Sequence, residues 1–198
     1  DHIMKKLALI LPMLLGISAC SSTSDGITTK KETVLTPECA YQDAPEKAAP
    51  MWVCGVPIEG FAFTQVGFSE KKPSATMTNS AATADARAKM SSYFATMVSD
   101  MFSQYQKSLE TEEASKYVID TDMVRETVSS MTLFGTRTVR TMTSPSGGQY
   151  VLLAMDEATF AANQKKVFAA LEDEDAEIKQ LFENEQARER LMSMFKVQ

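Results

Sequence analysis

The sequence is short of the residues that most enzyme and metal sites need. It contains one histidine, His2, and only three cysteines in 198 residues. Because no histidine follows Met4, the composition excludes Ser-His-Asp and Cys-His catalysis, histidine-ligated zinc and two-histidine iron sites. We find no catalytic constellation, no metal ligands and no cofactor motif, and we expect a protein that is not an enzyme.

Positive charge is also scarce. Lysine and arginine number 20 against 26 aspartates and glutamates, which gives a net charge of −6 and argues against a nucleic-acid partner held through its phosphates. The acidic run at residues 172–175 lacks the turn of a calcium loop, and no Lys-Ser/Thr pair follows Gly147 and Gly148 as a phosphate loop requires. We interpret these two features as a solvated helix face and a turn.

No apolar run approaches the roughly 20 residues that span a bilayer, but a shorter one stands near the N-terminus. Residues 1–3 precede Met4, after which Lys5 and Lys6 lead into the apolar residues 7–15. This order is typical of a signal peptide. We therefore assign residues 1–19 to the three leading residues and the signal peptide that follows them.

The signal ends on Ile-Ser-Ala-Cys at residues 17–20, which resembles a bacterial lipobox. The resemblance implies that Cys20 is acylated, with palmitate among its chains, and becomes the mature N-terminus. Several acyl chains bind a membrane far more firmly than one. Ser21 follows instead of aspartate, which favours the outer membrane, with the body facing the periplasm. The alternative is an ordinary cleaved signal with a coincidental cysteine.

Residues 20–49 are predicted to be a lipid-anchored flexible tether, because they combine low hydrophobicity with scattered prolines. Cys39 and Cys54 are the other two cysteines, and in an oxidising compartment they are most simply a disulfide. Two free thiols, or bridges between subunits, are the alternatives that the sequence leaves open.

The folded body is predicted to begin near Pro50. Residues 52–53 and 61–68 have strand character, and residues 136–143 and 149–155 form a β-hairpin around a five-residue loop. The type of structure at residues 116–133 is not settled by its pattern. Together with two long helices, these elements predict an α+β fold in which a small antiparallel sheet is covered by a helix.

The first long helix is predicted from residue 78 or 79 to about Leu109, with Asn79 or Ser80 as its N-cap. Its early alanines would let the helix lie close to a sheet. One apolar stripe recurs every three or four residues: Ala82, Ala86, Met90, Phe94, Met97 and Met101.

Residues 157–198 are predicted to form a single amphipathic helix that runs to about Lys196. Such a helix is longer than a small sheet can cover, so its apolar residues must pack on a neighbouring part of the chain, on a partner or on a second copy. We call these residues the apolar seam and treat them as a candidate interaction surface: Phe160, Val167, Leu171, Ile178, Leu181, Met192 and Phe195.

Several segments between residues 50 and 156 are similar to the Lpp-twenty family of bacterial lipoproteins. They are Pro-Met-Trp-Val at 50–53, Val-Gly-Phe at 66–68, the alanine-rich run at 81–90, Thr-Val-Arg at 138–140 and the run from Tyr150 to Asp156. The resemblance implies a dodecin-like domain, a sheet wrapped about a long helix, that often self-associates and has no known enzyme activity. Some relatives, the FlgP-type lipoproteins, build disks or rings around the flagellar motor. Cys54, the spacer at 55–59 and the C-terminal helix depart from the family pattern.

The leading hypothesis is therefore an outer-membrane lipoprotein with a structural, self-assembling or partner-docking role in the cell envelope. Its partners would be membrane lipid through Cys20, further copies of itself and an envelope protein, including a flagellar ring. The alternative is a periplasmic module that binds a small ligand in an apolar cleft.

Overall fold

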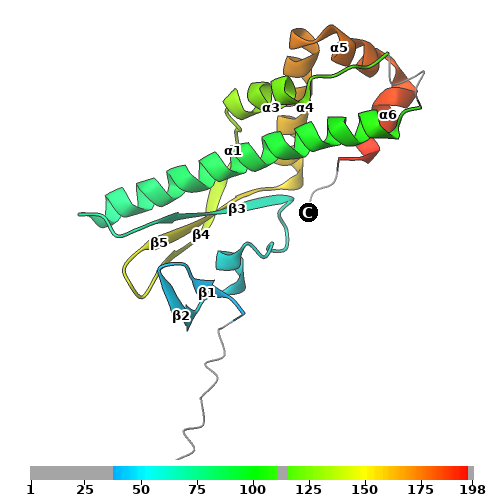
Figure 1. The fold of residues 1–198 in the computed structure, drawn as a ribbon. Coiled ribbons are helices and arrows are strands. Elements are labelled where there is room, and N and C mark those ends of the chain that lie inside the picture. The colour runs from blue at the N-terminus through cyan, green and yellow to red at the C-terminus, as the bar shows by residue number, and fades with distance from the viewer. Residues whose placement is uncertain (1–37, 111–115, 196–198) are drawn as a thin grey trace, which may run out of the picture. The chain divides into compact units, whose positions relative to one another are not determined.

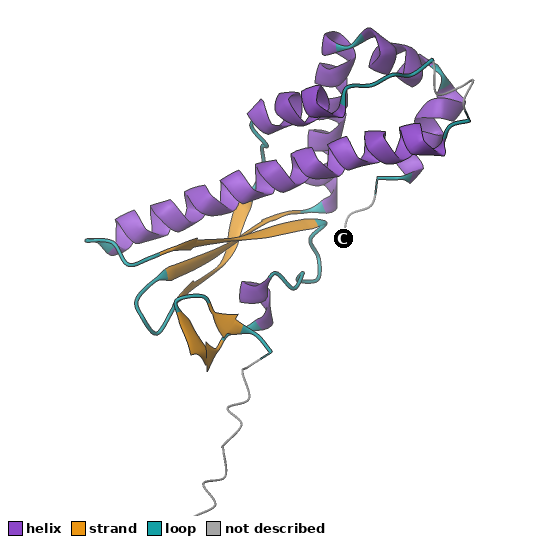
Figure 2. Cartoon of the chain, in the orientation of Figure 1, coloured by secondary structure: helices purple, strands orange, loops and turns teal. Residues whose placement is uncertain are grey.

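The computed structural model describes residues 38–110 and 116–195, all of which fall in one contact unit. Figures 1 and 2 show the arrangement of the helices and strands. The fold is α+β, as predicted, and it contains a second small antiparallel sheet that the sequence did not predict. No helix in the described ranges is both long and apolar enough to cross a membrane.

The main sheet contains three antiparallel strands in the order β3-β5-β4: β3 (Phe63–Ser69), β5 (Gln149–Met155) and β4 (Arg137–Thr143). The register of β3 against β5 runs from Phe63 opposite Met155 to Ser69 opposite Gln149. The predicted hairpin of β4 and β5 is confirmed, with a bulge between Thr138 and Arg140. Since side chains alternate along a strand, β5 supplies apolar residues to both faces of the sheet.

The long helix α1 (Ala75–Ser108) covers one face of this sheet. Its N-cap is Ser74, whose hydroxyl accepts a hydrogen bond from the amide of Met77 at 3.2 Å. The helix therefore begins about one and a half turns earlier than an N-cap at Asn79 or Ser80 would have placed it. Ala82 and Ala86 lie directly against Gly67 of β3, as the alanine-rich start of the helix predicted.

The other face is covered by residues 38–54, which we call the N-terminal cover. It comprises β1 (Ala40–Tyr41), β2 (Ala44–Ala48) and the 3-10 helix η1 (Met51–Cys54). Two predictions fail here. The tether does not extend to residue 49, and residues 52–53 are helical because Trp52 turns inward, only 5% exposed, onto the sheet. The part of the predicted tether before residue 38 lies outside the described residues.

The predicted C-terminal helix is three helices: α4 (Glu157–Glu174), α5 (Ala176–Glu183) and α6 (Glu185–Ser193). The breaks fall at Asp175 and Asn184, which have extended backbone angles and cap the helices that follow them. The Asp175 carboxylate accepts from the amide of Ile178 at 2.8 Å, and the Asn184 side chain accepts from that of Ala187 at 3.1 Å. Residues that cap a new helix interrupt the preceding one.

These breaks fold the segment back onto α1, so residues 157–195 are part of the body and not a separate arm. The main core between α1, the sheet and the later helices includes five seam residues with at most 6% exposure: Phe160, Val167, Leu171, Ile178 and Leu181. Met192 and Phe195 are partly buried against the same core. The ambiguous segment contains α3 (Thr121–Ser130), which lies beside α1 and contributes Val124 and Val128.

Candidate functional site: the N-terminal junction

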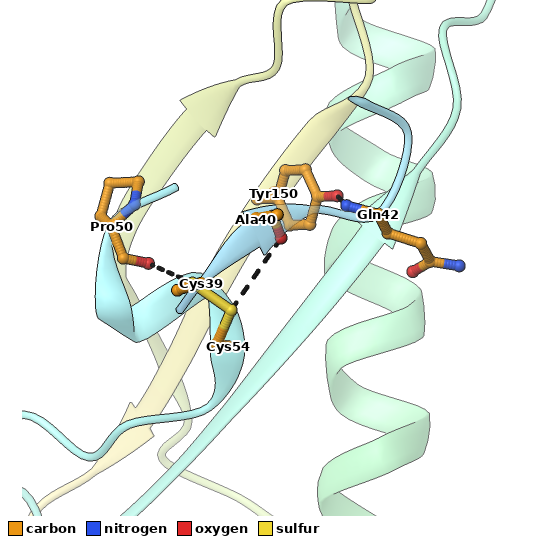
Figure 3. Close-up of a disulfide and its surroundings, with 6 residues drawn as sticks. All are labelled: Cys39, Ala40, Gln42, Pro50, Cys54 and Tyr150. Carbon is orange, nitrogen blue, oxygen red and sulfur yellow. Dashed lines mark hydrogen bonds between the residues drawn. A yellow bond between two sulfur atoms is a disulfide. The ribbon is translucent and has the colours of Figure 1, made fainter. Parts of the chain in front are cut away.

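The point where the N-terminal segment enters the fold is closed by a disulfide. Cys39 precedes β1 and Cys54 ends η1, and the two are bonded with a Cα–Cα distance of 5.9 Å. The predicted pairing is thus confirmed within one chain. Figure 3 shows the sulfurs beside the carbonyl oxygens of Pro50 and Ala40, at 3.3 and 3.9 Å. Oxidised sulfur carries no proton to donate, so these distances are packing contacts.

A second tie joins the turn between β1 and β2 to the loop between β4 and β5. Asp43 accepts hydrogen bonds from the hydroxyls of Ser144 and Ser146 on one carboxylate oxygen. Its other oxygen accepts from the Tyr150 hydroxyl at 3.2 Å. We call Asp43, Ser144, Ser146 and Tyr150 the Asp43 latch, which spans more than 100 positions of sequence.

Backbone amides complete the hydrogen bonding of the latch. The Tyr150 hydroxyl accepts from the amide of Gln42 at 2.8 Å, a contact drawn in Figure 3. The Ser144 hydroxyl accepts from the amide of Gly148 at 2.9 Å. No buried side-chain nitrogen or oxygen lacks a hydrogen bond in the described ranges, so the latch is a fully satisfied network.

The pKa shifts of Asp43 and Tyr150 agree with the hydrogen bond that Tyr150 donates to Asp43. Burial raises the pKa of Asp43, but the hydrogen bonds from Ser144 and Ser146 outweigh it and lower the pKa overall. Burial and the nearby negative charge of Asp43 raise the pKa of the Tyr150 hydroxyl, against a lowering by the Gln42 amide. At neutral pH, Asp43 is therefore a charged acceptor and Tyr150 a neutral donor.

Beneath both ties lies a small apolar cluster, the back core. It contains Tyr41, Ala44 and Trp52 of the cover with Tyr150 and Leu152 of β5. The Tyr150 ring lies 5.6 Å from that of Tyr41 and 4.7 Å from that of Phe68, measured between centroids. The junction thus combines a covalent bond, a charged hydrogen-bond network and apolar contact, and this chemistry holds two segments together.

Two grooves lie away from the junction. One, of about 700 Å³, is bounded by residues 60–62, Glu157, Phe160, Met192 and Phe195. The other, of about 490 Å³, lies between Arg87 and the chain that follows α3. In the described ranges, no group of three or more histidine, cysteine, aspartate or glutamate side chains is placed to hold a metal ion.

The structure distributes the predicted site residues unevenly. Cys39 and Cys54 are brought together, whereas Cys20 lies outside the described residues. The prediction that the apolar seam is an interaction surface is wrong for five of its seven residues, which lie inside the main core. The helix breaks at Asp175 and Asn184 let the three helices bring those side chains into the core that they share with α1 and the sheet.

Sequence reasoning missed the Asp43 latch. The Ser-Pro-Ser-Gly-Gly stretch at residues 144–148 was interpreted only as a turn, and Asp43 was placed in a tether. No local sequence pattern marks Asp43 or the serines as hydrogen-bond partners, because their pairing depends on where the N-terminal cover docks on the sheet. No family model matches the sequence, and neither a curated protein nor a solved structure does.

Proposed function

We propose that the protein is a lipoprotein of the bacterial outer membrane, held there through acylated Cys20 with its body in the periplasm. The body would serve as a structural or docking module that assembles with copies of itself or with an envelope partner. The Cys39–Cys54 disulfide is the observation that carries the proposal. Disulfides persist in oxidising compartments such as the periplasm, and this one fastens the segment that follows Cys20 to the fold.

Two features of the sequence support the same proposal. The residues at 17–20 match the pattern of a lipobox after a short apolar signal. The segments between residues 50 and 156 that resemble the Lpp-twenty family favour self-association, and the FlgP-type relatives favour a flagellar ring as the partner. The junction also supports a structural role, because its polar groups hydrogen-bond to one another and hold the N-terminal cover on the sheet.

Membrane anchoring is tested by replacing Cys20 with serine and separating membrane and soluble fractions of cells that express the full chain. We expect the wild-type protein in the outer-membrane fraction and Cys20→Ser in the soluble fraction or retained as a precursor. Ser22→Ala is a matched control that leaves the cysteine in place and should behave as wild type. An equal amount of Cys20→Ser and wild type in the outer-membrane fraction would reject the anchor.

A second candidate function, binding of a small ligand in the periplasm, is favoured by the groove beside Phe160 and Phe195, whose walls also include Phe61 and Met192. Light scattering and native mass spectrometry of the Cys20→Ser protein, purified from the soluble fraction, separate the two functions. Oligomers without a retained small molecule support the structural role. A monomer that carries a small molecule supports the ligand-binding role.

A further inference from the structure

The disulfide bridges the two ends of the N-terminal cover. Cys39 is the second residue that the structure describes and lies just before β1, while Cys54 is the last residue of η1. The bond therefore closes a loop, with a sequence separation of 15, that contains both strands of the cover and most of η1. Any force that reaches Cys39 from the N-terminal side has two routes into the fold: along this loop or across the bond.

The loop would be easy to peel if it carried the force alone. The β1–β2 hairpin has strands of two and five residues, and isolated two-stranded hairpins of this size are marginal in water. Its strongest attachments, Tyr41, the Asp43 latch and Trp52, come one after another along the chain. A pull at residue 38 would load them in series, beginning at the free end of β1.

The bond changes this path. Because Cys39 and Cys54 are covalently joined with Cα atoms only 5.9 Å apart, tension passes across the sulfurs and the longer loop between them stays slack. The force then enters the body beyond Cys54, where the amide of Ala62 bonds to the carbonyl of Met155 at 3.0 Å and β3 pairs with β5 along its full length.

We propose that the Cys39–Cys54 disulfide is a load bypass, which carries tension from the membrane anchor past the N-terminal cover and into β3. The cover then stays docked on the back core, and Tyr150 and Leu152 stay buried while the segment before it is pulled. The inference rests on the proposed function, because an anchor at Cys20 and a body docked on an envelope partner would put the chain between them under tension. It assigns the disulfide a mechanical role in addition to its contribution to stability.

Force spectroscopy tests the bypass. The full chain with Cys20→Ser is pulled from tags at its two ends, with and without a phosphine reductant. The oxidised protein should show no separate release of the cover. The reduced protein should show an additional step, at lower force than the main unfolding event, that lengthens the chain by about 50 Å, as expected for fifteen residues at ~3.6 Å each. A reduced protein that releases this length within the main event would overturn the proposal.

Hydrogen exchange provides a second readout on the same oxidised and reduced protein, without force. Reduction should raise the exchange of residues 40–53 at least about tenfold while α1 and β5 stay protected, as expected for a unit that opens by itself. Oxidised Val128→Ala, which weakens the main core, is the control and should not expose residues 40–53 selectively. Unchanged or uniformly increased exchange on reduction would count against a separable cover.

These measurements do not depend on lipidation. An unmodified Cys20 would reject the proposed function and leave the mechanical result standing. A cover that peels only with the whole fold would reject the bypass and leave the anchor untouched.

Discussion

Gly67 and Ala86 determine how closely α1 lies on the sheet. A Cβ atom built on Gly67 would overlap the backbone of α1 and come within 2.7 Å of the Ala86 Cβ. Ala86 itself is fully buried. The pair leaves no room for an added methyl group on either side, since interiors are close-packed and extra carbon forces the backbone apart.

Ala86→Val should therefore lower the free energy of unfolding by about 1–3 kcal/mol through overpacking. Ala84→Val makes the same change on the exposed side of the helix and should cost only the difference in helix propensity, about 0.6 kcal/mol or less. Urea unfolding of both variants measures the difference. Equal losses would show that the helix does not approach the sheet as closely as described.

Asp43 makes the stability of the junction depend on pH. Its pKa is lowered in the folded state, so its contribution is complete above the pKa of the unfolded chain. That contribution is lost as the pH falls through the lowered folded value. Asp43→Asn keeps the shape of the side chain and removes the charge. We expect wild type to be more stable than Asp43→Asn at pH 7, with the gap shrinking as the pH falls below 3.8, the ordinary pKa of an aspartate.

Urea unfolding at several pH values measures this gap, and Asp100→Asn on the exposed surface of α1 serves as the control. A gap between wild type and Asp43→Asn that is the same at pH 7 and in acid would mean that the charge of Asp43 contributes nothing to the latch.

At the scale of elements, strands and helices with strong periodicity were predictable and breaks within a pattern were not. The apolar run in residues 149–155 reflects burial on both faces of the sheet, and the alanine-rich stripe of α1 reflects burial on one face of the helix; both leave a continuous signal in the sequence. The long-helix prediction failed because the apolar spacing continues across Asp175 and Asn184. Asp175 and Asn184 are themselves a signal for these breaks, since aspartate and asparagine favour N-caps. The signal is ambiguous, because the same residue types also occur on solvated helix faces.

The cap at Asp175 gives an element-scale prediction. Asp175→Ala removes the acceptor for the amide of Ile178 and should cost about 1 kcal/mol of unfolding free energy. Asp173→Ala, two residues earlier in the last turn of α4, provides a matched control and should be near neutral. Thermal or urea unfolding distinguishes the two, and an unaffected Asp175→Ala protein would indicate that α4 and α5 are one continuous helix in solution.

At the scale of the whole molecule, the N-terminal cover and the helices α4 to α6 both belong to the body. The sequence predicts a tether for the first, because that stretch is polar and contains prolines, and leaves open whether the amphipathic second segment packs on this chain, on a partner or on a second copy. The docking of the cover and of α4 to α6 is set by long-range contacts, such as the Asp43 latch and the rings of Phe94 and Phe160 at 5.4 Å. Local patterns do not report such contacts.

A chain that ends at Asp156 should consequently fail to fold cooperatively. The truncation opens the main core, because it removes several of its fully buried side chains, among them Leu171, Ile178, Leu181 and Leu191. We expect loss of near-ultraviolet circular dichroism and of a sigmoidal urea transition. A truncated protein with a sharp transition would show that residues 50–156 are an independent domain.

The central claim is that acylated Cys20 anchors the body to the membrane. Mass spectrometry of the N-terminal peptide of the protein isolated from membranes tests this claim most directly. The account predicts a mature chain that begins at Cys20 and carries the mass of its acyl groups. A free Cys20 thiol, or a mature chain that begins elsewhere, would contradict it.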